Sequence, residues 1–165
     1  MSHSKTATAH IRPATIGDVP ELVRLILELA EFEGMSAQVR LSEAEFRQHL
    51  FGPNPVCECL VAEIDGDIAG LAVFCHNFST FQSRRGLYLD DLYVQRRYRG
   101  LGLGRKLVTQ LAAIAIERNC GRFEWYVLDW NVAAIHFYKS VGADIVADLR
   151  VCRVAGDRLR DMVTN

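Results

Sequence analysis

The chain has 165 residues, 50% of them hydrophobic, and its 19 basic and 20 acidic residues give a net charge of −1. This length and composition suit one folded domain with a full core. A charge so close to zero does not indicate nucleic acid or an anionic membrane surface as a partner. No apolar run approaches the ~20 residues of a membrane span, and the first ten residues are polar, so neither a membrane helix nor a secretory signal is expected. We therefore expect a cytoplasmic protein, frayed over residues 1–9, with a single domain over residues 10–165.

The first elements of the chain are a strand and a helix. Residues 10–14 predict a short strand. Asp18 followed by Pro20 has the pattern of a helix start, with a capping acid and a proline in the first turn, and this helix should run to about Phe32.

A second helix and a hairpin follow. Ser42 and Glu45 form a capping box, which predicts a helix start at that point. Two β-rich runs, 56–64 and 68–78, are joined by Asp65-Gly66. An Asp-Gly pair between apolar runs is a strong hairpin signal.

The second half alternates strands and helices. It predicts a strand over 86–95, a helix over 102–118, a strand over 123–128, a helix from Asn131 to Gly142, and a hairpin formed by 143–147 and 150–154. A strand, loop, helix and strand in succession form a crossover, so the strands over 86–95 and 123–128 should be parallel. The predicted fold is therefore α/β, with a mostly antiparallel mixed sheet, one parallel pair and four flanking helices.

The cysteines and histidines do not indicate a metal site. The five cysteines include no C-x-x-C pair, and zinc-ligand spacing is absent. We interpret the cysteines as reduced core or near-core residues, and His49, His76 and His136 as surface or structural residues.

A glycine-rich segment, Arg99-Gly100-Leu101-Gly102-Leu103-Gly104-Arg105-Lys106, lies between a predicted strand and a predicted helix. Glycines allow unusual backbone angles and close approach of a ligand to amides at a helix N-terminus, which suits pyrophosphate. A plain glycine-rich turn is the alternative. The dinucleotide fingerprint fails because Arg105 stands where glycine or alanine is needed, and the P-loop fails because no Gly-Lys-Ser/Thr follows.

The pattern that fits is Arg/Gln-x-x-Gly-x-Gly/Ala, and it resembles the acetyl-CoA loop of the GNAT N-acyltransferase superfamily. The resemblance extends over nearly the whole chain and is closest to the spermidine/spermine and thialysine N-acetyltransferases. It is carried by the segments 11–14, 28–33, 59–63, 88–91, 98–100, 127–131 and 137–143. It implies acetyl-CoA as co-substrate, no metal, and a homodimer. The residues it implies for cofactor binding are Leu92, Val94, Arg99, Gly100, Leu101, Gly102, Leu103, Gly104, Arg105 and Asn131.

The resemblance also assigns chemical roles. The amide of Leu92, at a bulge in the fourth strand, is expected to polarise the thioester carbonyl. Tyr138 is the expected general acid for the leaving thiolate, and an ordinary core aromatic is the alternative. Asn131 should cap its helix and contact the pantetheine arm.

Three acids are candidates for the acceptor amine. Asp90 and Asp91 should point to opposite faces of one strand, so that only one of them, directly or through a water, takes the amine proton. The alternative is a strand-end carboxylate paired with Arg84, Arg85 or Arg96. Glu33 matches the family's polyamine contact.

Two departures from the animal polyamine enzymes weaken the polyamine assignment. Gly34 replaces a bulky aromatic, and Ala147 replaces an acid. The predicted function is acetyl transfer to a primary amine of a small cationic acceptor, a diamine, a polyamine or a thialysine-like amino acid. A GNAT enzyme acting on a protein N-terminus or lysine, and a non-catalytic acyl-CoA sensor, are the alternatives.

Overall fold

The computed structural model describes residues 9–164. The expected frayed start lies outside these residues, except for Ala9, which pairs with Ile64. The chain divides into two compact units, Met1–Tyr126 and Val127–Asn165, which are described separately. Within the described part, no helix combines the length and apolarity that crossing a membrane requires.

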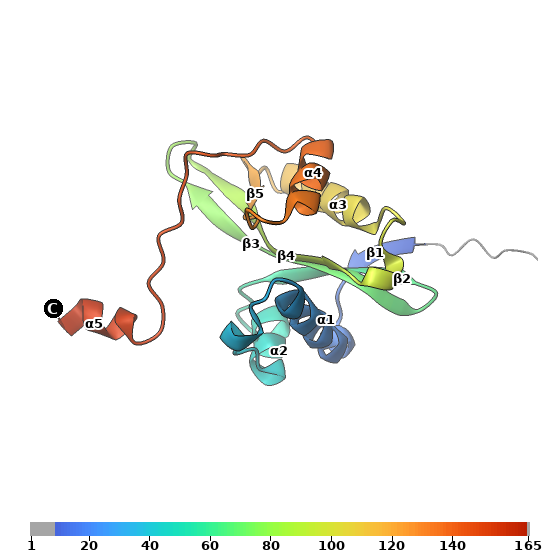
Figure 1. Cartoon of the computed structure of the whole chain (residues 1–165), viewed down its shortest axis with the longest axis horizontal. Helices are drawn as coiled ribbons and strands as arrows, with labels where there is room; N and C mark the ends of the chain where they lie inside the picture. Colours follow the sequence, from blue (N-terminus) through green and yellow to red (C-terminus); the bar gives the residue numbers. More distant parts are fainter. Residues whose placement is uncertain (1–8, 165) are drawn as a thin grey trace, which may run out of the picture. The chain divides into compact units, whose positions relative to one another are not determined.

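The first unit is built on a five-stranded sheet with strand order β1-β2-β3-β4-β5 (Figure 1). Its strands are β1 (Ala9–Pro13), β2 (Glu58–Ile64), β3 (Asp67–Ser79), β4 (Arg84–Val94) and β5 (Phe123–Trp125). All neighbours are antiparallel except β4 and β5, which are parallel. The predicted mixed sheet with one parallel pair is confirmed, although the fifth strand is shorter than the expected 123–128.

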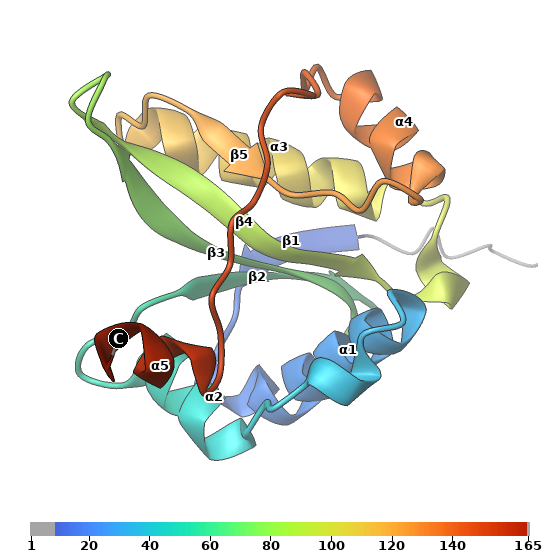
Figure 2. The ribbon, with the colours of Figure 1, turned by 60° about the vertical axis from the view of Figure 1, so that its left-hand side comes forward.

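Helices cover both faces of this sheet. Figure 2 shows α1 (Val19–Phe32) and α2 (Glu43–Phe51) on one face and α3 (Leu103–Glu117) on the other. Each face has its own core. Leu22, Leu25 and Val61 are among the buried residues beneath α1 and α2. Leu107 and Leu111 are among those beneath α3. The sheet is therefore buried on both sides through its middle.

Local signals explain several of these boundaries. The β2–β3 turn consists of Asp65 and Gly66, both with positive φ (51° and 90°), as the favoured two-residue hairpin turn requires. Ser42 Oγ accepts a hydrogen bond from the Glu45 amide at 3.4 Å and caps α2 as predicted. Short 3-10 turns, η1 (Ile16–Asp18), η2 (Ser36–Gln38) and η3 (Arg96–Tyr98), connect the elements.

Asp18 has a different role from the expected cap. Its side chain makes no capping bond to α1. It accepts hydrogen bonds from Arg12 (2.8 Å) and from the Thr15 amide (2.6 Å), and these contacts lower the pKa of Asp18 to about 2. Asp18 therefore ties the end of β1 to the start of α1.

The second unit contains α4 (Val132–Ser140) and α5 (Arg158–Thr164). The hairpin predicted over 143–147 and 150–154 is wrong, since these residues form no strand in the described chain. An isolated hairpin buries too little apolar surface to be stable by itself. Most side chains in this segment are exposed, including those of Val146, Leu149 and Val151. The helix α5 was not predicted.

Candidate active site

A β-bulge interrupts β4 at Asp90. Val73 of β3 pairs with Asp91, but the next residue of β3, Phe74, pairs with Leu89, so Asp90 is an extra residue in β4. A bulge shifts the alternation of side chains along its strand. Leu89 packs in the core beneath α3, whereas Asp91 lies opposite Val73, whose side chain belongs to the core beneath α1 and α2.

Carboxyl groups gather at this bulge. Burial, Asp90 and Glu33, in that order, raise the pKa of Asp91 to about 7. Burial also raises the pKa of Asp90 and of Glu33. The end of α1 and the middle of β4 thus bring three acids into electrostatic contact. A carboxyl group with a pKa near 7 is about half ionised at neutral pH, which suits a general base, and the cluster attracts cations.

The expectation that Asp90 and Asp91 point to opposite faces is wrong. Leu89 and Leu92, which flank the two acids, both pack in the core beneath α3, so both acids face the other side, where each acts on the thiol of Cys57 and Asp90 acts on Asp91. The physical reason is the extra residue in β4, because strict alternation would place Asp91 on the same face as Leu89.

The alternative in which these acids form arginine pairs at the strand end is not observed. Among the ion pairs of residues 9–164, none joins Asp90 or Asp91 to Arg84, Arg85 or Arg96.

Two thiols and a phenol border the acid cluster, and sequence reasoning did not single them out. Burial is the main cause that raises the pKa values of Cys57 and Cys75, with a contribution from Asp90. Burial, followed by Asp90, raises the pKa of Tyr88 to about 12. These neighbours are therefore neutral at pH 7. The hairpin turn alone would place Cys57 opposite Phe74, and the register shift at Ala62 and Glu63, which the sequence did not indicate, brings Cys57 toward Cys75 instead.

The bulge also determines where the following amides point. The Gln95 amide donates to the Ala69 carbonyl of β3 at 2.9 Å, and alternate amides of a strand point the same way. The amides of Leu92 and Val94 therefore point away from β3, toward the side where β5 pairs only with Leu87–Leu89. This orientation suits an amide that donates to a ligand at the edge of β4.

The glycine segment has the geometry of an anion-binding loop. Gly100 and Gly102 have φ values of +82° and +76°, and a Cβ at either would meet nothing within 4 Å. Backbone conformation, rather than crowding, therefore requires glycine at both positions. The first intrahelical bond of α3 runs from the Lys106 amide to the Gly102 carbonyl at 3.1 Å. The amides of Leu103 and Gly104 precede it and have no acceptor within the helix.

Arg99 connects this loop to α1. Its Nε donates to the Val94 carbonyl at 3.0 Å, and its guanidinium lies 5.0 Å from the centre of the Phe32 ring and 5.7 Å from that of Tyr93. The structure thus gives Arg99 a role in holding the end of β4 against α1. Its contact with a bound pyrophosphate stays a prediction.

The order of elements and this loop agree with a comparison to known protein families, in which residues 21–143 match the Acetyltransferase (GNAT) family. The chain belongs to the GNAT acetyltransferase family. Membership makes it an acetyltransferase enzyme, as the resemblance of its glycine loop predicted.

Two acetyltransferases and one solved structure are similar to this chain. A thialysine N-epsilon-acetyltransferase of Mus musculus is 37% identical, over 94% of this chain and 98% of the relative. A spermidine/spermine N(1)-acetyltransferase-like protein 1 of Homo sapiens is 37% identical over 81% of this chain, which corresponds to 20% of that longer protein. Among solved structures, an integron cassette protein from the mobile metagenome of V. cholerae superposes with a TM-score of 0.79 at 26% identity, covering 95% of this chain and 98% of that one.

The second unit of this GNAT protein holds two further predicted residues. Asn131 Oδ1 accepts a hydrogen bond from the Ala134 amide at 3.1 Å, so its predicted capping of α4 is confirmed. Tyr138 is buried, with 8% of its surface exposed, and its ring centre lies 5.3 Å from that of Phe137. The catalytic role of Tyr138 and the pantetheine contact of Asn131 stay predictions.

Proposed function

We propose that this enzyme transfers the acetyl group of acetyl-CoA directly to a primary amine of a small cationic acceptor. The observation that carries the proposal is the acid cluster of Glu33, Asp90 and Asp91, in which the pKa of Asp91 is raised to about 7. A negative cluster attracts an ammonium group, and a base with this pKa accepts its proton near neutral pH.

The glycine loop supports acetyl-CoA as the donor. In this proposal the pyrophosphate binds the loop, the pantetheine arm follows the edge of β4, Asn131 keeps the pantetheine contact that the family resemblance implies, and no metal takes part. The proposed cofactor contacts are Leu92, Val94, Arg99, Gly100, Leu101, Gly102, Leu103, Gly104, Arg105 and Asn131. Positive φ at Gly100 and Gly102 and the first amides of α3 are the supporting geometry.

The reaction proceeds in one transfer step. The ammonium first gives its proton to Asp91, to Asp90 or to a water that they hold. The free amine then attacks the thioester carbonyl carbon, and the Leu92 N–H donates to the oxygen on which negative charge develops. The C–S bond breaks as the new C–N bond forms, and Tyr138 gives its hydroxyl proton to the leaving thiolate. The attacking nitrogen then loses its second proton, which returns through solvent to the Tyr138 phenolate, and the acid that took the first proton releases it to solvent.

The acceptor is proposed to carry a second positive charge. Glu33 lies at the end of α1 and acts electrostatically on Asp91, so the cluster can hold a distal ammonium while another acid takes the reacting proton. The printed names of the relatives, thialysine and spermidine/spermine acetyltransferases, support diamines, polyamines and thialysine-like amino acids as the class to test.

Three further parts of the proposal concern the whole chain. We propose that both units form a single N-acetyltransferase domain over residues 10–165, that the enzyme is a homodimer, and that it acts in the cytoplasm. Sedimentation of the purified chain tests the dimer.

An acceptor panel tests the function. Purified chain is incubated with acetyl-CoA and thialysine, putrescine, spermidine, lysine or short peptides, and thiol release is followed. Turnover on the small amines supports the proposal. Turnover on peptides alone would instead identify a protein acetyltransferase, and tight coenzyme A binding without turnover on any acceptor would identify an acyl-CoA sensor.

A further inference from the structure

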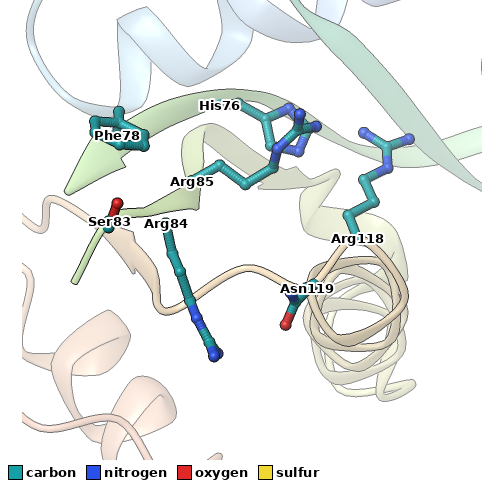
Figure 3. Close-up of a pocket in the computed structure, with 7 residues that line it drawn as sticks. All are labelled: His76, Phe78, Ser83, Arg84, Arg85, Arg118 and Asn119. Carbon is teal, nitrogen blue, oxygen red and sulfur yellow. The ribbon is translucent and has the colours of Figure 1, made fainter. Parts of the chain in front are cut away.

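A basic hollow lies in the first unit, between the hairpin end of β3 and β4 and the last turn of α3 (Figure 3). Its volume is about 540 Å³. The residues that line it are His76, Phe78, Ser83, Arg84, Arg85, Arg118 and Asn119. None of them is a predicted site residue, so the proposed acetyl transfer leaves this hollow unexplained.

The hollow carries an excess of positive charge. Arg118 forms an ion pair with Glu58, in which Nη2 lies 2.8 Å from Oε2. Within residues 9–164, neither Arg84 nor Arg85 has a carboxylate partner. Two uncompensated guanidinium groups therefore border one hollow of a chain whose net charge is −1.

His76 lies under the influence of these cations. Burial, Arg118 and Arg85, in that order, lower the pKa of His76, and Glu58 acts in the opposite direction. Its Nε2 is shielded from solvent and has no hydrogen-bond partner among the described residues. Figure 3 shows the Arg85 guanidinium beside the His76 ring, with Arg118 approaching from α3 and Arg84 turned away. Arg118 is paired with Glu58 whereas Arg85 has no carboxylate partner among the described residues, so a bound anion would offset the charge of Arg85.

The hollow is separate from the glycine loop. The loop precedes the first residue of α3, Leu103, while Arg118 and Asn119 follow its last residue, Glu117. A helix of this length spans about 22 Å at ~1.5 Å per residue. A phosphate held at the loop therefore leaves the hollow vacant for a second ligand.

We infer that this hollow binds the phosphate group of a small phosphorylated molecule, held chiefly by Arg85 and Arg118 beside His76. Guanidinium groups pair with phosphate oxygens through two parallel hydrogen bonds, and a phosphate monoester supplies the negative partner that Arg85 lacks among the described residues. Ser83 and Asn119 add neutral polar groups to the lining. Phe78, which is 61% exposed, offers an apolar wall for the organic part of the ligand.

The test follows the histidine ring signals of the full chain by NMR while inorganic phosphate or phenyl phosphate is added. Both probes are expected to shift the His76 signals and to raise the pKa of His76, because a nearby anion favours the imidazolium. Phenyl phosphate should bind more tightly than inorganic phosphate because of Phe78. Arg85→Ser should weaken both probes by about 10-fold or more, because a charge-assisted contact is lost.

Two controls separate this site from other effects. Arg47→Ser removes a charge on α2 that pairs with Glu43, and it should leave phosphate binding unchanged. Saturating coenzyme A should also leave the phosphate-induced shifts of His76 in place. Binding of coenzyme A at the glycine loop and binding of phosphate in the hollow are therefore tested independently.

Several outcomes would overturn the inference. These are unmoved His76 signals at 10 mM probe, equal shifts in folded Arg85→Ser protein, and loss of the shifts with coenzyme A. Equal affinity for the two probes would reject an organic ligand, and binding of a hexaglutamate peptide without binding of phosphate would identify a protein-docking surface instead.

Discussion

Glu33 and Asp91 lie far apart in the sequence, yet the carboxylate of Glu33 contributes to raising the pKa of Asp91 to about 7. One acid ends α1 and the other follows a bulge in β4. Burial, the charge of Asp90 and the charge of Glu33 each make ionisation of Asp91 less favourable.

The first prediction concerns Asp91 and pH. If ionised Asp91 takes the amine proton, kcat/KM should rise with pH and level off above about 7, the pKa of Asp91. Asp91→Asn should lower kcat/KM by about 100-fold or more, as expected for loss of a general base, and should remove this limb of the profile. A pH series with a diamine acceptor measures both. An unchanged limb in folded Asp91→Asn protein would assign the base elsewhere.

Asp91 should also affect stability in a pH-dependent way. A carboxyl group whose folded pKa is raised stabilises the protein most below its unfolded pKa of about 4, and this contribution is lost as pH rises through about 7. From pH 4 to pH 8, the free energy of unfolding of Asp91→Asn should therefore rise by roughly 1–3 kcal/mol relative to that of the parent protein, after allowance for partial exposure of the side chain. Urea unfolding at the two pH values measures it. An equal difference at both would contradict the raised pKa.

The second prediction separates Glu33 from a neighbouring acid. Glu33→Gln should raise KM for a diamine by about 10-fold, through loss of one charged contact, and should lower the pKa seen in the activity profile. Glu31→Gln is the matched control, because Glu31 is exposed at the same helix end and is not among the groups that raise the pKa of Asp91. Equal effects of the two substitutions would indicate that any lost negative charge at this helix end weakens binding, and that Glu33 makes no specific contact with the acceptor.

The third prediction compares two glycines with positive φ. Gly102→Ala and Gly66→Ala should each destabilise the protein by about 1 kcal/mol, because alanine is strained at φ values of 76° and 90°. Only Gly102→Ala should weaken coenzyme A binding, by about 10-fold or more, since Gly102 begins α3 and Gly66 lies in the β2–β3 turn. Calorimetry with coenzyme A decides. The loop loses its assigned role if the two variants bind equally well.

The fourth prediction concerns Tyr138. Tyr138→Phe keeps the ring that is buried in the second unit and removes only the hydroxyl. Thiol release should fall by roughly 10- to 1,000-fold while coenzyme A affinity changes little, because only the proton donor is lost. Full turnover in this variant would show that the thiolate receives its proton from another group.

The bulge could have been predicted from the spacing of leucines in β4. Leu87, Leu89 and Leu92 share the core beneath α3. Residues on one face of a regular strand lie two apart, so the three-residue step from Leu89 to Leu92 requires one extra residue between them. Strict alternation applied to the two acids alone predicts opposite faces, and the leucines that flank them show why that prediction is wrong.

In the C-terminal segment, by contrast, the local sequence pattern predicted strands that do not form. Residues 143–154 have a strand-like pattern but form no strand in the described chain, because a β pattern needs a neighbouring strand to satisfy its backbone groups. Local pattern cannot say whether such a neighbour is available.

The sequence by itself determined the order of the elements through α4, the Asp65-Gly66 turn, the caps at Ser42 and Asn131, and the glycine loop, since each depends on residues within a few positions. Only the tertiary structure decided that Glu33 reaches Asp91, that Cys57 borders the acids, and that Arg85 and Arg118 surround His76. The pKa shifts of Asp91, Cys57 and His76 depend on burial and on charges that distant segments bring together, and spacing along the chain reports neither quantity.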